Sequence, residues 1–125
     1  MIQVENLTKY YGPIRGIEEI TFNIDKGEVV GLLGPNGSGK TTTMRILTCF
    51  FPPTRGRALV NGYDVTKNPL EVQRHTGYFP EKAPLYPDMA VTEYLEFVGK
   101  VKGIKGEKRK KQIDKVMESC GIIEI

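Results

Sequence analysis

The chain has 125 residues, a formal net charge of +3 and 39% hydrophobic residues. This length can bury one hydrophobic core, and so mild a charge does not by itself indicate a nucleic-acid or lipid partner. No run of about 18 apolar residues is present, and the two cysteines lack the spacing of a metal site, so neither a membrane span nor a cysteine metal centre is expected.

The first segment that predicts an element by its pattern is EVVGLL, residues 28–33. It is short, almost wholly apolar and contains two adjacent valines. Such a run predicts a strand that is buried on both faces of a parallel sheet.

A glycine-rich segment follows directly, GPNGSGKT at residues 34–41, and fits the pattern G-x-x-x-x-G-K-[ST]. Glycines admit positive φ and let backbone N–H groups approach the charged oxygens of a polyphosphate closely. Lys40 is then predicted to bind the β- and γ-phosphates, the Thr41 hydroxyl to bind Mg²⁺, and Thr42 to donate to the α-phosphate. The alternative is a glycine-rich turn with an exposed lysine.

Helices are predicted in four places. Residues 41–50 contain no Gly or Pro and place apolar side chains at three-residue steps. Residues 68–71, NPLE, carry a capping-box pattern with Pro at the first helical position, which predicts a short helix. Residues 91–101 and the segment up to Cys120 each place apolar residues on one helical face, and Gly121 provides a C-terminal cap.

The glycine-rich loop with its extra threonine, GPNGSGKTT, resembles the Walker A segment of ATP-binding cassette (ABC) ATPases. LTKYYG at residues 7–12 is similar to the opening strand of that family, and ITFNI at residues 20–24 to its next strand. PTRG at residues 53–56 and ALVNG at 58–62 are similar to a turn and the strand that follows it.

The resemblance implies an α/β fold: a P-loop NTPase core with an antiparallel β part and the start of a helical subdomain, in truncated form. Residues 1–81 would form the ATP-binding core. Residues 82–125 would begin the helical subdomain and leave it incomplete.

Two further residues receive roles from the resemblance. Tyr11 lies just before Gly12, where the family places an aromatic ring that stacks on adenine; Tyr10 is the rival, and simple packing at a strand end is the alternative. Glu81 in GYFPE stands where the family usually has Gln. A carboxylate there could bind Mg²⁺ directly or through water, or it could point into solvent.

The expected site therefore has three groups of residues. The residues expected to contact ATP are Tyr11, Gly34, Asn36, Gly37, Ser38, Gly39, Lys40, Thr41 and Thr42. Lys40 and Glu81 are expected to be catalytic, and Thr41 and Glu81 to bind Mg²⁺.

A complete ABC ATPase also needs a Leu-Ser-Gly-Gly-Gln-type signature, a strand ending in Asp-Glu and a switch histidine. None occurs in these 125 residues. The chain is therefore expected to bind ATP and to hydrolyse it poorly, although the full-length protein would be an ATPase.

The resemblance implies the motor subunit of a membrane transporter, cytoplasmic and held at the cytoplasmic face of the membrane by its partners. Those partners are a second nucleotide-binding subunit, paired head to tail, and transmembrane permease subunits; no nucleic acid is expected. The alternative is a soluble ABC ATPase that acts on a ribosome or on DNA. Residues 61–65 and 77–81 resemble single-domain export-type subunits and favour the transporter.

Overall fold

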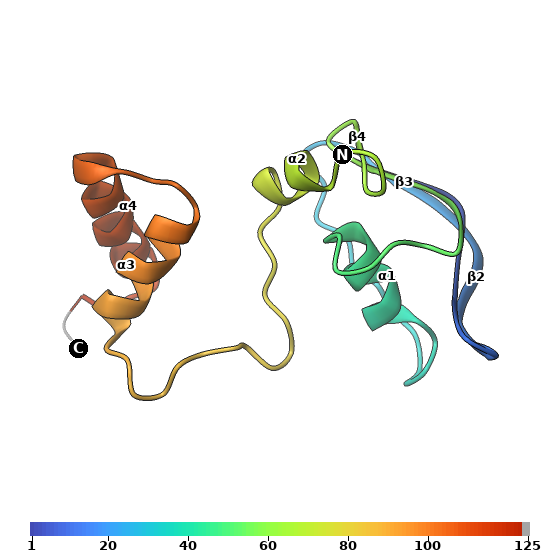
Figure 1. The fold of residues 1–125 in the computed structure, drawn as a ribbon, viewed down its shortest axis with the longest axis horizontal. Coiled ribbons are helices and arrows are strands. Elements are labelled where there is room, and N and C mark those ends of the chain that lie inside the picture. Colours follow the sequence, from blue (N-terminus) through green and yellow to red (C-terminus); the bar gives the residue numbers. More distant parts are fainter. Residues whose placement is uncertain (124–125) are drawn as a thin grey trace. The chain divides into compact units, whose positions relative to one another are not determined.

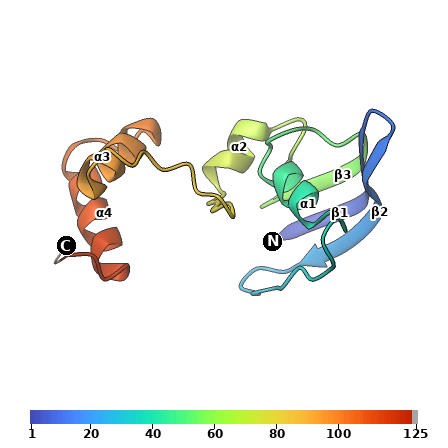
Figure 2. The same ribbon diagram turned by 90° about the horizontal axis from the view of Figure 1, so that it is seen from below.

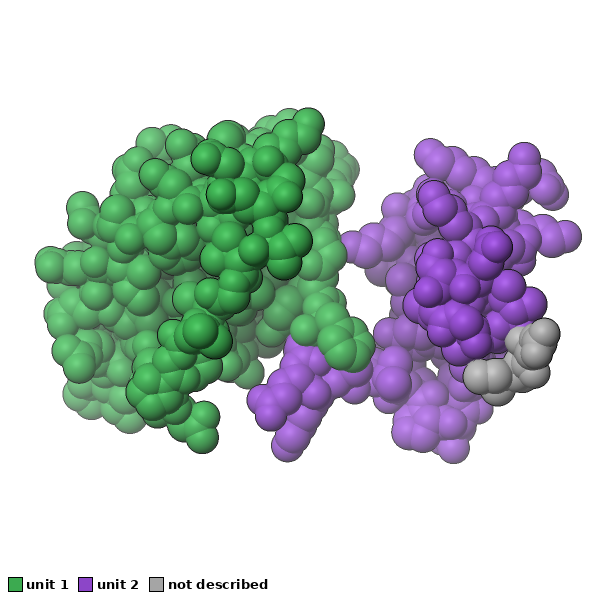
Figure 3. All heavy atoms as spheres, turned by 180° about the vertical axis from the view of Figure 1, so that it is seen from behind, with its two compact units in different colours: residues 1–79 green, residues 80–125 purple. Residues whose placement is uncertain are grey.

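The structure, a computed structural model, describes residues 1–123. It divides the chain into two units, Met1–Phe79 and Pro80–Ile125, which Figure 3 draws in different colours.

The first unit is built on a four-stranded sheet (Figure 1). Its strands are β1 (Ile2–Tyr11), β2 (Ile14–Ile24), β3 (Arg55–Val60) and β4 (Tyr63–Asp64). They lie in the order β2-β1-β3-β4, and each neighbouring pair is antiparallel. The antiparallel β part implied by the resemblance is therefore present.

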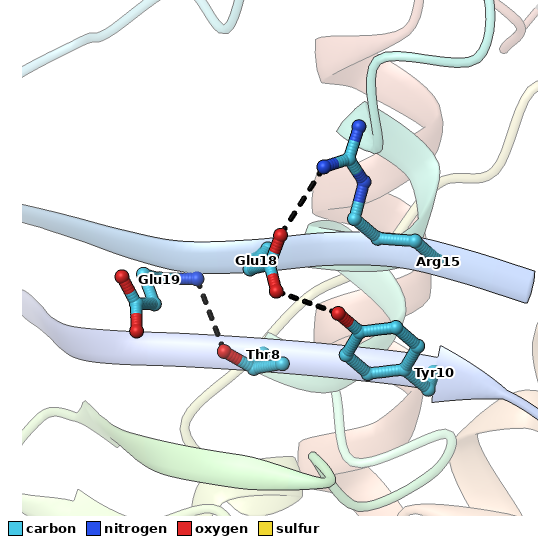
Figure 4. A network of polar contacts seen from close by, with 5 residues as sticks. All are labelled: Thr8, Tyr10, Arg15, Glu18 and Glu19. Carbon is cyan, nitrogen blue, oxygen red and sulfur yellow. Dashed lines mark hydrogen bonds and ion pairs between the residues drawn. The ribbon is translucent and has the colours of Figure 1, made fainter.

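Bulges interrupt the pairing of β1 with β2. Asn6 and Glu19 take positive φ values of 47° and 48° at these points. The Glu19 N–H is consequently turned away from the regular ladder and donates instead to the Thr8 hydroxyl, at 3.0 Å (Figure 4). Because Thr8 is buried, this bond satisfies a backbone group that would be costly to leave unpaired.

Helix α1 (Lys40–Leu47) packs against this sheet (Figure 2). Short helix α2 (Pro69–Arg74) follows β4, and Val72 is its buried residue. Together the sheet and the two helices enclose one hydrophobic core. Its buried members are Val4, Leu7, Ile17, Ile46, Leu47, Ala58, Val60, Val65 and Val72.

Buried Asp64 organises the turn that leads from β4 toward α2. Its Oδ1 accepts the N–H groups of Thr66 at 2.8 Å and Lys67 at 3.2 Å, and its Oδ2 lies 3.5 Å from Arg57 Nε. Burial raises the pKa of Asp64, but these hydrogen bonds and the guanidinium outweigh burial, so the pKa lies below its ordinary value.

The second unit contains two helices, α3 (Val91–Val101) and α4 (Gly106–Ser119), which pack on each other. Glu96 joins them by an ion pair to Arg109 at 2.9 Å. The predicted C-terminal cap at Gly121 is confirmed. Its N–H donates to Glu118 O and the Ile122 N–H to Met117 O, the two bonds of a Schellman motif.

The prediction of a buried strand over residues 28–33 was wrong. These residues have no strand hydrogen bonding, and Val29 and Leu33 are almost fully exposed. A parallel strand needs parallel neighbours, whereas every paired strand within residues 1–123 belongs to the antiparallel sheet. Val30 and Leu32 instead line an apolar groove of about 560 Å³ between this segment, the sheet and α1.

The helix predicted over residues 41–50 is confirmed but ends earlier, at Leu47. Cys49 has φ 59°, and the N–H groups of Cys49 and Phe50 donate to Ile46 O and Arg45 O. This is a Schellman ending with cysteine in the position that glycine usually occupies. Phe50 consequently leaves the helix and is exposed.

We predict that Gly56→Ala destabilises the first unit by about 2 kcal/mol or more. Gly56 has φ 84°, and a Cβ there would collide with the Asn6 backbone and lie 2.7 Å from Glu5 O. The matched control is Gly62→Ala: its φ is 83°, but an added Cβ meets no described atom within 4 Å. Urea unfolding of both variants measures the difference, and equal losses of free energy of unfolding would contradict the close approach of β3 to β1.

Candidate nucleotide-binding site

Residues 34–39 form a tight loop that leads into α1. Gly37 and Gly39 have φ values of 81° and 94°, which few residues other than glycine adopt without strain. The Ser38 N–H donates to Pro35 O at 3.1 Å and closes the turn. A Cβ at Gly34 would lie 2.5 Å from Ser38 Oγ, so this glycine is needed for space rather than for its φ.

Gly39 fixes the loop to the sheet. A Cβ at this position would collide with the Ile17 side chain on β2 and lie 2.7 Å from Gly16 O. The missing side chain therefore lets the base of the loop rest directly on the β2 backbone. The Thr43 N–H and hydroxyl both donate to Gly39 O, each at 2.9 Å, and tie the same residue to α1.

Lys40 turns back over the loop. Its Nζ donates to Gly34 O at 2.5 Å and to Pro35 O at 2.8 Å. An ammonium group has three donors, so two hold the lysine in place and a third is left for a ligand oxygen. The positive charge consequently sits at the loop rather than in open solvent.

The start of α1 adds donors beside this charge. The first helical bond within the loop–helix junction runs from Thr43 to Gly39, so the N–H groups of Lys40, Thr41 and Thr42 have no acceptor inside the helix. They carry the positive end of the helix dipole. Thr41 is exposed there, and Thr42 is half-buried. The loop and helix start together form a cradle of donors that suits an anion.

Tyr11, at the end of β1, lies beside the same helix start. Its hydroxyl oxygen is 3.1 Å from Thr42 Oγ1. The Phe51 and Tyr11 rings pack at right angles, with a centroid distance of 5.6 Å and an interplanar angle of 89°. The Tyr11 side chain nevertheless remains 40% exposed, which leaves ring surface for a ligand.

Tyr10, the rival aromatic, is engaged elsewhere (Figure 4). Its hydroxyl donates to Glu18 Oε1 at 2.6 Å, and Arg15 Nη1 donates to Glu18 Oε2 at 3.1 Å. The hydrogen bond between Tyr10 and Glu18 raises the pKa of Tyr10 and lowers the pKa of Glu18. The structure thus brings Tyr11, and not Tyr10, to the start of α1.

Three further predicted site residues lie on the surface: Asn36, Ser38 and Glu81. Asn36 and Ser38 are exposed in the loop itself. Glu81 is exposed and belongs to the second unit, whereas the loop belongs to the first. Among residues 1–123 no group of three or more His, Cys, Asp or Glu side chains could hold a metal ion.

Sequence reasoning missed the residues that hold Tyr11. Lys9 Nζ donates to Pro52 O at 2.8 Å and lies 4.8 Å above the Phe51 ring. A Cβ at Gly16 would come within 2.8 Å of Tyr11 Cε2. The alternation of Lys9 and Tyr11 along one strand, which places both on one face, was the available signal.

Comparison with known proteins gives consistent matches. The model of the ABC transporter family matches residues 17–125. The chain is 34% identical over 125 residues to the probable multidrug ABC transporter ATP-binding protein YbhF of Escherichia coli, covering all of this chain and 22% of that protein. It is 37% identical over 124 residues to the linearmycin resistance ATP-binding protein LnrL of Bacillus subtilis, covering 99% and 40%.

Solved structures agree with these relatives. An ATP-binding subunit of an ABC transporter superposes with a TM-score of 0.83 at 28% identity, over 98% of this chain and 51% of that one. The dimeric post-hydrolysis state of the ATP-binding cassette MJ0796, bound to ADP and Pi, superposes with a TM-score of 0.79 at 26% identity, over 94% and 56%. The P-loop ATPase fold that the sequence predicted is therefore confirmed.

The chain spans about a fifth to two-fifths of the curated relatives named above and about half of the solved ones. No helix within residues 1–123 combines the length and the apolar character needed to cross a bilayer. The family model matches residues 17–125, and a solved ATP-binding subunit superposes over 98% of the chain. This chain therefore belongs to the ABC transporter family.

Proposed function

We propose that this chain supplies the phosphate-binding half of an ATP site in an ABC transporter motor subunit. The observation that carries the proposal is Lys40, whose ammonium is held over the glycine-rich loop by two backbone carbonyls beside the free N–H groups of α1. This arrangement concentrates positive charge and directed donors where a triphosphate would lie.

The remaining loop residues take supporting roles in the proposal. Gly34, Gly37 and Gly39 let the backbone approach the phosphates, and Asn36 and Ser38 lie in the loop around them. Thr42 donates to the α-phosphate, and the exposed part of the Tyr11 ring stacks on adenine. Stacking on an aromatic ring contributes about 1–3 kcal/mol in comparable nucleic-acid sites.

We propose that the Thr41 hydroxyl and the Glu81 carboxylate would hold Mg²⁺. Both offer the oxygen ligands that Mg²⁺ prefers. When bound, the ion neutralises charge on the β- and γ-phosphates. We assign residues 1–81 to the ATP-binding core and residues 82–125 to the start of a helical subdomain.

In the whole protein we propose ATP hydrolysis that drives transport across a membrane. Two cassettes would close head to tail over ATP and move permease subunits, which would hold the protein at the cytoplasmic face. The dimeric cassette structures support the pairing. The 125 residues alone would bind ATP without efficient hydrolysis, because they contain no signature segment or Asp-Glu strand end.

We predict that Lys40→Ala weakens ATP binding by the full chain about tenfold or more, because a charge-assisted contact to phosphate is lost. Isothermal titration with ATP measures the change. Lys111→Ala, an exposed lysine on α4 in the second unit, is the matched control and should bind like the unsubstituted chain. Equal affinity of all three proteins would contradict a phosphate-binding role for Lys40.

We predict that Glu81→Ala raises the Mg²⁺ concentration that half-saturates ATP binding by about threefold or more, because one oxygen ligand of the ion is removed. Glu81→Gln keeps a carbonyl oxygen and should shift this concentration less. Glu107→Ala, an exposed glutamate of the same unit, is the control. An unchanged Mg²⁺ dependence in Glu81→Ala would show that Glu81 is an ordinary surface residue.

A further inference from the structure

The hydroxyl of Tyr11 makes a contact that ring stacking does not require. Stacking on a base needs only the face of an aromatic ring, which phenylalanine also provides. In this chain the hydroxyl is directed at α1, and its oxygen lies 3.1 Å from Thr42 Oγ1. Within residues 1–123, the Thr42 hydroxyl makes its side-chain hydrogen bond with Tyr11.

The Tyr11 ring is held in the position that makes this contact. The Phe51 ring packs perpendicular to it, and the Lys9 ammonium lies 5.7 Å from its centroid. The same ammonium is anchored to Pro52 O at 2.8 Å. On the β2 side, Gly16 leaves room for the ring, since a Cβ there would come within 2.8 Å of Tyr11 Cε2.

Chemistry fixes the direction of the hydrogen bond once phosphate is bound. Ionised phosphate oxygens only accept hydrogen bonds, so a Thr42 hydroxyl that contacts them must donate its single proton. Its lone pairs then accept from the Tyr11 O–H. Successive bonds of this kind polarise and strengthen one another.

We propose that Tyr11 is a positioning residue for the phosphate site: its hydroxyl donates to Thr42 Oγ1, orients the Thr42 hydroxyl and strengthens its bond to the α-phosphate. This inference rests on the proposed ATP-binding function. Tyr11 thus acts on both ends of the nucleotide, with its ring at the base and with its hydroxyl, through Thr42, at the phosphates.

The test compares ATP with inorganic tripolyphosphate, which has no base, as competitors of a fluorescent ATP analogue on the full chain. Tyr11→Phe keeps the ring and should weaken the binding of both ligands about threefold to tenfold, because the lost hydrogen bond acts on phosphate. Tyr11→Leu also removes the ring, so it should weaken ATP more than tripolyphosphate. Thermal unfolding of each variant confirms that it is folded.

A double-mutant cycle locates the effect at Thr42. Thr42→Val removes the donor to phosphate itself, so it should weaken binding at least as much as Tyr11→Phe. Adding Tyr11→Phe to Thr42→Val should change nothing further. Thr42→Ser keeps a hydroxyl, so the effect of Tyr11→Phe should return in that background. If the Tyr11 hydroxyl had only a structural role, the effect of Tyr11→Phe on binding would not depend on whether residue 42 carries a hydroxyl.

Three results would overturn the inference: unchanged affinity in Tyr11→Phe, a loss confined to ATP, or a full loss that persists in Thr42→Val. Lys40→Ala separates this failure from failure of the proposed function. If Lys40→Ala loses ATP while Tyr11→Phe does not, only the hydroxyl role is wrong. If the unsubstituted chain binds neither ligand, both proposals are wrong.

Discussion

The contact between Gly39 and β2 is the constraint on which the site depends. A side chain at residue 39 would collide with Ile17, so only glycine allows the base of the loop to rest on the strand. The contact sets the height of α1 above the sheet, because Gly39 O also accepts from Thr43 at the first turn of the helix. Ile46 and Leu47, one turn further on, are then buried in the core.

The contact between Gly39 and β2 also explains why Tyr11 lies beside the start of α1. β2 pairs with β1 along its length, so a helix that is fixed to β2 at Gly16 and Ile17 begins close to the end of β1. Tyr11 stands at that end and contacts Thr42 in the first turn of α1. Residues separated by about thirty positions in the sequence are thus brought together by backbone packing rather than by a long-range ion pair.

The fold was predictable where the pattern is local. The helices over residues 69–74 and 91–101 follow from proline placement and apolar periodicity, and both were found. The strand expected over residues 28–33 was not, because a buried strand depends on neighbours that local sequence cannot supply. The end of α1 was also missed. Cys49 adopts the positive φ that glycine usually takes at a helix end, so the sequence lacked the glycine that would have indicated the end of the helix.

The site divides in the same way. The loop residues from Gly34 to Thr42 were predicted from a local pattern of glycines, lysine and threonine, and their roles toward ATP stay predictions. The surroundings of Tyr11 were not predicted, since Phe51, Pro52 and Gly16 reach the ring through tertiary packing. Glu81 stays a prediction, because it belongs to a different unit from the loop.

The position of Lys40 has a consequence for how a ligand would associate. Its bonds to Gly34 O and Pro35 O hold the lysine side chain over the loop, so conformational entropy of this side chain is lost on folding. In the proposed ATP site, this order would reduce the entropy that is lost when phosphate binds. The positive charge held there would also attract an anion to the proposed site.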